Sequence, residues 1–163
     1  MAARVRINYY LQRGYLYRVR RGLYAKDKNY DRFELATKIF TPSYISFETV
    51  LGRSGVTFQH YGQIFVASYI TREIKADDQK YSYRKIKDTI LTNNLGIGHK
   101  DNYSIASAER AFLDVVYFNT DYHFDNLSAL NWDKVFETLP IYGGNKRMER
   151  AVKKYYEGTK AQN

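Results

Sequence analysis

One pair of residues in this sequence has the types and spacing of a metal-dependent active site. Glu73 and Lys75 form an E-x-K pattern on a predicted strand, which occurs in metal-dependent nucleases. That chemistry requires an acid shortly upstream, to hold the metal together with the glutamate. The nearest upstream acids, Glu48 and Glu34, fall on predicted helices. We therefore favour an exposed strand edge of mixed charge over a nuclease.

Other catalytic patterns are missing from the sequence. His60, His99 and His123 lie far apart, and none has a second ligand at metal-binding spacing. The glycines of the segment Gly96–Gly98 lack the third glycine and the following helix of a dinucleotide loop. The chain has no cysteine, which excludes disulfides, thiolate zinc sites and cysteine nucleophiles. We expect no catalytic residues, no metal and no cofactor, and hence a protein that is not an enzyme.

The distribution of charge is more informative than any catalytic pattern. The net charge is +9, of which residues 1–26 contribute +7, residues 27–145 contribute −2 and residues 146–163 contribute +4. The leading segment contains no acid and seven basic residues: Arg4, Arg6, Arg13, Arg18, Arg20, Arg21 and Lys26. Two basic ends on a nearly neutral body attract polyanions, and nucleic acid is the usual one. Solvated charges that keep the ends soluble are the alternative.

The overall composition is that of a globular protein. With 163 residues, of which 44% are hydrophobic and 26% charged, the chain has the size of one domain or one domain with an appendage. No apolar run approaches the roughly 18 residues of a membrane span, and the start does not resemble a signal peptide. We expect a cytoplasmic protein with no membrane contact.

The basic leading segment is predicted to form a helix and a hairpin. Val5, Ile7 and Leu11 give a short amphipathic helix that ends at Gly14. An alternating segment at residues 15–20, a turn at residues 21–22 and a return at residues 23–25 indicate a β-hairpin. This order is that of the second half of a winged helix-turn-helix. Because only four residues precede Val5, we expect a partial module without its supporting helices.

The remainder is predicted to fold as an α+β domain, with a mostly antiparallel sheet of four or five strands and several helices. Pro42–Glu48 is interpreted as a turn into a helix capped by Ser46, and Ile90–Leu91 as a strand. Arg110 and Asp114 are placed on the exposed flank of a helix over 107–118. The other expectations are helices over about 31–40, 132–139 and 145–157, strands within 56–105, and a tail from Thr159 to Asn163.

An aromatic and basic strand offers a second nucleic-acid interpretation. Tyr81 and Tyr83 are flanked by the basic residues Lys80, Arg84, Lys85 and Lys87. Such a strand could stack on single-stranded nucleic acid or form a protein interface, since tyrosine and arginine are enriched there. An ordinary half-buried strand is at least as consistent with the pattern.

Several segments, in this order and spacing, resemble the AbiEi family of antitoxins. They are YRVRRGLY at residues 17–24, FELA at 33–36, PSYISFE at 42–48 and IASAERAFLD at 105–114. The resemblance runs from about residue 4 to residue 118. Members of this family are the antitoxins of type IV bacterial toxin–antitoxin and phage-defence (abortive infection) pairs.

The resemblance implies a division of labour along the chain. Residues 1–28 would be the remnant of a winged helix that binds double-stranded operator DNA at inverted repeats and represses its own operon. Residues 29–158 would be an α/β antitoxin domain that neutralises a nucleotidyltransferase-like toxin. The implied DNA-binding residues are Arg4, Arg6, Asn8, Tyr9, Gln12 and Arg13 on the helix, and Arg18, Arg20 and Arg21 on the wing. The alternative is a stand-alone module that binds RNA or single strands without a toxin partner.

Overall fold

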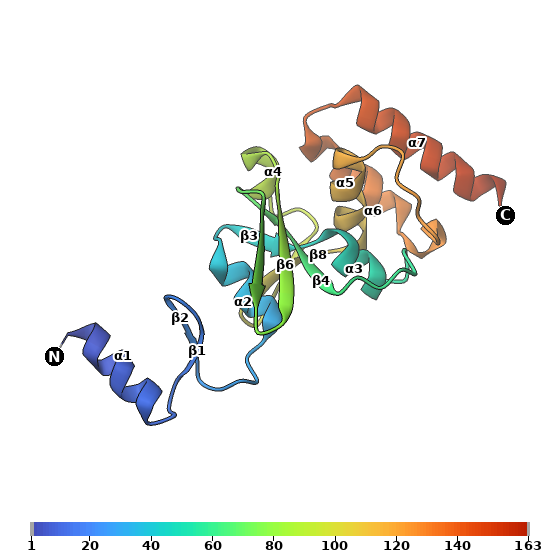
Figure 1. Ribbon diagram of the computed structural model, residues 1–163. Coiled ribbons are helices and arrows are strands. Elements are labelled where there is room, and N and C mark those ends of the chain that lie inside the picture. Colours follow the sequence, from blue (N-terminus) through green and yellow to red (C-terminus); the bar gives the residue numbers. More distant parts are fainter. Residues whose placement is uncertain (1, 163) are drawn as a thin grey trace.

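The computed structural model describes residues 2–162 and shows an α+β fold. Helix α1 (Ala3–Gln12) and the hairpin of β1 (Tyr17–Arg20) and β2 (Leu23–Ala25) come first. Figure 1 shows these N-terminal elements projecting from one end of the body, with the C-terminal helix at the other end. The predicted order of a helix followed by a hairpin is confirmed. Met1 and Asn163 lie outside the described residues.

A six-stranded sheet forms the centre of the body. Its strands are β3 (Ser43–Ile45), β4 (Gln63–Ser68), β5 (Arg72–Ala76), β6 (Gln79–Lys85), β7 (Ile97–Lys100) and β8 (Tyr103–Ala106). Their order across the sheet is β5-β6-β4-β3-β8-β7. The pairs β5/β6, β4/β3 and β8/β7 are antiparallel, and β6/β4 and β3/β8 are parallel. The mostly antiparallel sheet is thus confirmed, with more strands than the four or five expected.

The strand β3 corrects one sequence-based interpretation. Ser43–Ile45 was expected to be part of a turn, but it is an inner strand of the sheet, between β4 and β8. Three residues are too few for an alternating pattern to show, and the preceding Pro42 favoured the turn interpretation. Helix α3 (Phe47–Arg53) follows immediately. Ser46 occupies its N-cap position as predicted, but the Ser46 hydroxyl makes no capping bond.

The other helices pack on the sheet or on one another. They are α2 (Arg32–Ile39), α4 (Asp88–Leu91), α5 (Ala108–Phe118), α6 (Trp132–Thr138) and α7 (Lys146–Ala161), with 3₁₀ turns at Leu127–Ala129 and Leu139–Tyr142. Helices α2 and α5 contact strands, whereas α6 and α7 pack on α5. Side-chain N-caps begin four of them, at Asp31, Ser107, Asn131 and Asn145. Figure 1 shows α5, α6 and α7 gathered at the C-terminal end, and α2 nearer to the hairpin.

Two further expectations about secondary structure are corrected. Ile90–Leu91 lies in the short helix α4 and not in a strand. The sequence could not distinguish the two, because two adjacent apolar residues fit the buried side of either element. The segment from Thr159, expected to be a tail, continues helix α7 to Ala161. Gly158 lies inside the helix, and no proline follows it to end the helix.

The pair Arg110 and Asp114 is buried, whereas the sequence placed it on an exposed flank. Both side chains have an exposed fraction of 0%. The Arg110 guanidinium donates hydrogen bonds to the backbone carbonyls of Ile90 (2.7 Å) and Asn93 (3.0 Å), and to that of Leu95. These carbonyls lie in and just after α4. The guanidinium therefore supplies hydrogen-bond donors to carbonyl groups at the C-terminal end of a short helix, which have no partner within the helix.

The Asp114 carboxylate is held by three hydroxyl groups. Tyr44 (2.9 Å), Ser46 (2.7 Å) and Tyr142 (2.6 Å) donate hydrogen bonds to its oxygens, and Arg110 Nε lies 3.7 Å from Oδ1. Burial raises the pKa of Asp114, while the guanidinium and the three hydroxyl donors oppose that rise. The pair therefore belongs to the core and forms no part of an accessible site.

Candidate nucleic-acid interface

Helix α1 presents its polar and basic side chains to solvent on nearly all sides. Arg4, Arg6, Asn8, Gln12 and Arg13 are all exposed, and the helix has no buried residue. It ends where Arg13 leaves the helix and Gly14 adopts a left-handed conformation (φ 74°), as the sequence predicted. The apolar residues of α1 do not dock on the body, since Val5 is 52% exposed.

The six predicted contact residues of α1 fall on two separate stripes. With 3.6 residues per turn, Arg4, Asn8 and Gln12 follow one another at intervals of four along one side of the helix. Arg6, Tyr9 and Arg13 form a second stripe, turned by about 130° from the first. One groove of a duplex can receive only one stripe and its margins. The structure therefore separates residues that the sequence had placed together.

The hairpin carries its arginines on the opposite side from its apolar residues. Tyr17 and Val19 of β1 are half-buried, whereas Arg18 and Arg20 are exposed, so the predicted alternation is confirmed. Arg21 is exposed in the tight turn, where Gly22 adopts φ 83°. A glycine is needed there because a Cβ disfavours the left-handed region.

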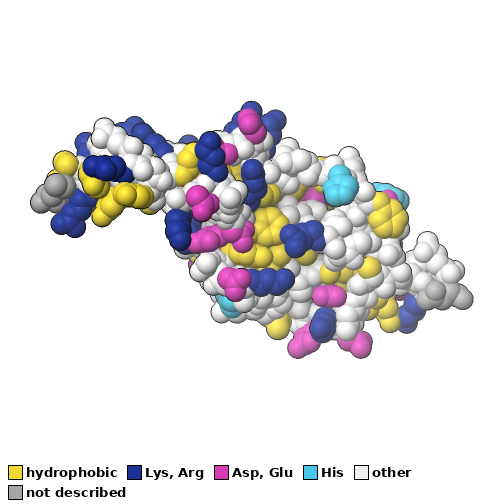
Figure 2. Space-filling model, turned by 90° about the horizontal axis from the view of Figure 1, so that it is seen from below, with side chains coloured by type: hydrophobic (Ala, Val, Ile, Leu, Met, Phe, Trp, Pro, Cys, Tyr) yellow, Lys and Arg dark blue, Asp and Glu magenta, His cyan; other side chains and the backbone are white. Residues whose placement is uncertain are grey.

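The arginines of this module have no acidic partner. Within residues 2–162, none of Arg4, Arg6, Arg13, Arg18, Arg20 and Arg21 takes part in an ion pair. Arg13 lies over the Tyr9 ring at 5.3 Å, which leaves its guanidinium edge open to solvent. Figure 2 shows lysine and arginine side chains distributed over the projecting N-terminal end, and the acidic side chains of this face over the rest of the molecule.

A single carboxylate fastens the hairpin to the body. Asp77, in the turn between β5 and β6, accepts hydrogen bonds from the hydroxyls of Tyr17 (2.8 Å) and Tyr30 (2.6 Å). The two tyrosine rings are stacked, with centroids 6.4 Å apart. Val19 and Leu23 pack against the core beside them. This contact, which we call the Asp77 clamp, sets the position of the arginine-bearing hairpin relative to the sheet.

The electrostatics of the Asp77 clamp follow from its hydrogen bonds. The donation from Tyr30, then that from Tyr17, lowers the pKa of Asp77, because both bonds favour the charged carboxylate. The same bonds raise the pKa of Tyr17, and burial raises that of Tyr30. The sequence alone does not reveal the Asp77 clamp. No local pattern links Asp77 to tyrosines 60 and 47 positions away.

The residues considered for catalysis do not assemble into a metal site. Glu73 and Lys75 are exposed on β5, where Lys75 Nζ lies 3.8 Å from Asp78. His99 Nδ1 forms a hydrogen bond with the Ser104 hydroxyl (2.9 Å). Among the residues that the structure describes, no group of three or more histidine, aspartate or glutamate side chains could hold a metal ion.

The aromatic strand considered for single-stranded nucleic acid is buried. Tyr81 and Tyr83 on β6 are 0% and 1% exposed, and the Tyr83 hydroxyl donates to the Ala36 carbonyl (2.7 Å). Both rings are part of the buried core, so neither can stack on a base. The sequence left an ordinary half-buried strand open as the alternative, and β6 is an inner strand, between β5 and β4.

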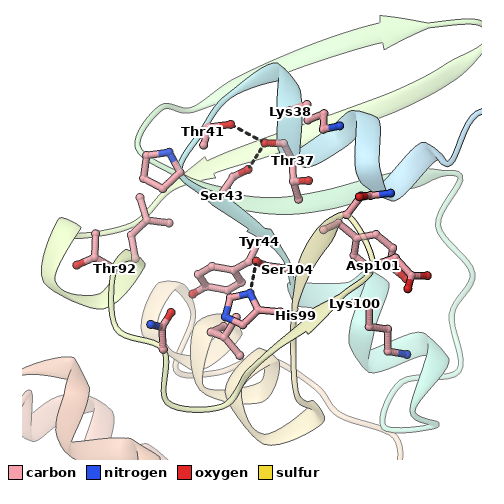
Figure 3. A pocket seen from close by; sticks show the side chains of 16 residues that line it. Thr37, Lys38, Thr41, Ser43, Tyr44, Thr92, His99, Lys100, Asp101 and Ser104 are labelled. Carbon is pink, nitrogen blue, oxygen red and sulfur yellow. Dashed lines mark hydrogen bonds between the residues drawn. The ribbon is translucent and has the colours of Figure 1, made fainter. Parts of the chain in front are cut away.

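A hollow lies away from the N-terminal arginines, between α2, β3, α4 and the β7–β8 hairpin. Its volume is about 560 Å³. Figure 3 shows hydroxyl side chains along its wall and the His99–Ser104 pair beside the Tyr44 ring. The hydroxyls of Thr41 and Ser43 already donate to the Thr37 carbonyl. These hydrogen bonds support the local fold around the hollow.

In comparisons with known proteins, neither a protein-family model nor a curated protein matches the chain. Within residues 2–162, no helix has the length and apolar character needed to cross a membrane.

Proposed function

We propose that this protein binds duplex DNA through α1 and the β1–β2 hairpin, and that it acts as the antitoxin and autorepressor of a type IV toxin–antitoxin pair in the cytoplasm. One observation carries the DNA-binding part: a projecting module displays six exposed arginines that have no acidic partner among residues 2–162. The antitoxin part rests on the resemblance of four sequence segments to the AbiEi family. In this proposal, residues 2–28 act as a partial winged helix.

The two stripes of α1 suggest different roles in the complex. Arginine can bind guanine with two hydrogen bonds, and asparagine and glutamine can bind adenine in the same way. The stripe of Arg4, Asn8 and Gln12 therefore suits the floor of the major groove. Arg6 and Arg13 on the second stripe would then meet a phosphate strand at the groove edge.

The hairpin arginines supply contacts that do not depend on sequence. Arg18, Arg20 and Arg21 point away from the apolar face of the hairpin, as a wing on the phosphate backbone requires. The Asp77 clamp fixes the hairpin to the body. The body, residues 29–158, would carry the neutralising activity against a nucleotidyltransferase-like toxin and perform no chemistry of its own.

The DNA-binding part is tested by the salt dependence of binding. We would measure fluorescence anisotropy of a labelled duplex from upstream of the gene, for the wild type and for the combined variant Arg18→Ala, Arg20→Ala, Arg21→Ala. Loss of three phosphate contacts lowers the slope of log K against log salt by about 2.7. Because the three side chains are exposed, thermal unfolding should stay unchanged.

The control removes three other cations, Lys75, Lys100 and Lys134, which are exposed on separate elements. The combined alanine variant of these residues has the same net charge as the arginine variant, and its slope should change by less than one. Equal slopes for the two variants would reject the wing assignment. A single-stranded probe that binds more tightly than the duplex would favour the stand-alone alternative.

The antitoxin part requires a growth assay. The chain would be co-expressed with the product of an adjacent nucleotidyltransferase-like reading frame. We expect the wild type to restore growth, and the triple arginine variant to restore growth while losing repression of a promoter fusion. Failure of the wild type to restore growth would reject the antitoxin role and leave the DNA-binding result standing.

A further inference from the structure

The C-terminal helix α7 carries a second concentration of positive charge, at the end of the molecule away from α1 (Figure 1). Its basic residues are all exposed: Lys146, Arg147, Arg150, Lys153, Lys154 and Lys160. The only acids on the helix are Glu149 and Glu157. With 3.6 residues per turn, these cations cover the side of the helix opposite Met148 and Val152.

The inner side of α7 is firmly packed, which fixes the direction of the basic face. Met148 and Val152 are 1% and 0% exposed. The Tyr155 hydroxyl donates to the carbonyls of Thr120 (2.9 Å) and Tyr122 (2.6 Å). The outer face is therefore presented by a rigid 16-residue helix that does not have to fold on binding.

The cations differ in how free they are to meet a ligand. Lys146 pairs with Glu149 (3.2 Å), and Lys160 lies over the Tyr156 ring (4.4 Å). Lys154 borders a hollow of about 370 Å³ that Asp121 also lines.

Three cations remain for a ligand. Arg147, Arg150 and Lys153 lie along successive turns and take part in no ion pair within residues 2–162.

The chemistry of the outer face of α7 favours a nucleic-acid backbone over a membrane surface. A basic helix that binds a membrane surface inserts a free apolar side, but the apolar side of α7 is already buried in the core. A sugar-phosphate backbone needs only aligned, solvated cations. Residues 146–160 extend over about 21 Å, which matches the rise of roughly six base pairs of a duplex.

We propose that the outer face of α7 is a second nucleic-acid site, which binds the sugar-phosphate backbone without reading sequence. Arg147, Arg150 and Lys153 are its principal contacts. The site lies far from the N-terminal module, so it is independent of the proposed operator-binding residues and adds a contact with a separate stretch of nucleic acid.

The test compares salt slopes on duplex DNA and on duplex RNA of the same sequence. The combined variant Arg147→Ala, Arg150→Ala, Lys153→Ala should lower the magnitude of the slope of log K against log salt by about 2.7. Between about 50 and 200 mM salt, the affinity of the wild type should therefore fall by a factor about 40 times larger than that of the variant. The alanine variant of Lys75, Lys100 and Lys134 is the charge-matched control.

A background that lacks the wing arginines makes the second site easier to measure. In the triple variant of Arg18, Arg20 and Arg21, the α7 substitutions should lower the remaining salt slope by about a further 2.7, and the contacts of α1 account for the binding that is left. Thermal unfolding should be unchanged by the α7 substitutions, because the side chains are exposed and alanine favours helix. The duplex that shows the greater loss identifies the backbone that the site takes.

The outcomes separate this proposal from the proposed function. An α7 variant that binds like its charge-matched control overturns the second site, and the basic face then serves an acidic protein or solubility alone. Loss in the α7 variant but not in the wing variant overturns the operator-binding module and leaves the second site intact. A wild type that binds neither duplex overturns both.

Discussion

Removing the buried carboxylate of Asp114 should be the most damaging single change in the body. Asp114→Ala leaves the Arg110 guanidinium buried at 0% exposure without its counter-ion, and it leaves the hydroxyls of Tyr44, Ser46 and Tyr142 without their acceptor. Breaking a buried pair by removing one partner costs about 3–5 kcal/mol. We expect a loss of that size in the free energy of unfolding.

A smaller change to the same network gives a graded comparison. Tyr142→Phe removes one hydrogen bond to the carboxylate but leaves those from Tyr44 and Ser46 in place. A bond to a charged group contributes about 1.5–3 kcal/mol, so this variant should lie between the wild type and Asp114→Ala. Asp121→Ala, at an exposed carboxylate, is the control and should stay within about 0.5 kcal/mol of the wild type.

Urea denaturation followed by circular dichroism measures all three variants. The midpoint should fall in the order control, Tyr142→Phe, Asp114→Ala, with an unchanged dependence on urea if the same surface is exposed on unfolding. A loss below about 1 kcal/mol for Asp114→Ala would refute the reasoning, since it would mean that water reaches the pair and replaces the carboxylate.

Two further predictions concern the hairpin and a tight loop. Because the hydroxyls of Tyr17 and Tyr30 lower the pKa of Asp77, docking of the hairpin is fully present above the unfolded value of about 3.9 and is lost as the pH falls through the folded pKa. The protection of hairpin amides, taken relative to the intrinsic exchange rate at each pH, should therefore fall in the wild type as the pH drops through the folded pKa of Asp77. In Asp77→Ala the protection should already be low at neutral pH, and a variant as well protected as the wild type there would contradict the clamp. Gly96→Ala should destabilise the protein by about 2 kcal/mol, because φ is +75° and the added Cβ would lie 3.0 Å from a side-chain carbon of the buried arginine of α5. Gly158→Ala, at an open helical position with no close neighbour, should stabilise the protein by about 0.5–1 kcal/mol. Urea denaturation measures both glycine variants.

The parts that sequence analysis located correctly are those in which short-range patterns decide the structure. The N-terminal helix, the hairpin that follows it and the α5 helix all follow from local periodicity and turn residues. The exposure of the hairpin arginines also followed from alternation with Tyr17 and Val19. The strand β3 could not be found in this way, because only its neighbours β4 and β8 define it.

The burial of several polar side chains could not be predicted from the sequence, for a different reason. Arg110, Asp114, Tyr81 and Tyr83 carry polar groups that usually face water, and the sequence offers no sign of the partners that satisfy them in the core. Those partners are supplied by distant segments, such as the Ala36 carbonyl for the Tyr83 hydroxyl. The Asp77 clamp was missed for the same reason.

The shortest strand pairing in the central sheet is that between β3 and β8. Three residue pairs join β3 to β4, but the pair of Ile45 with Ile105 alone aligns β3 with β8. The hydroxyls of Tyr44 and Ser46 on either side of Ile45 reach across to Asp114, on the helix that continues from β8. The Asp114 carboxylate therefore joins the two halves of the sheet through side chains, at the place where their backbone pairing is shortest.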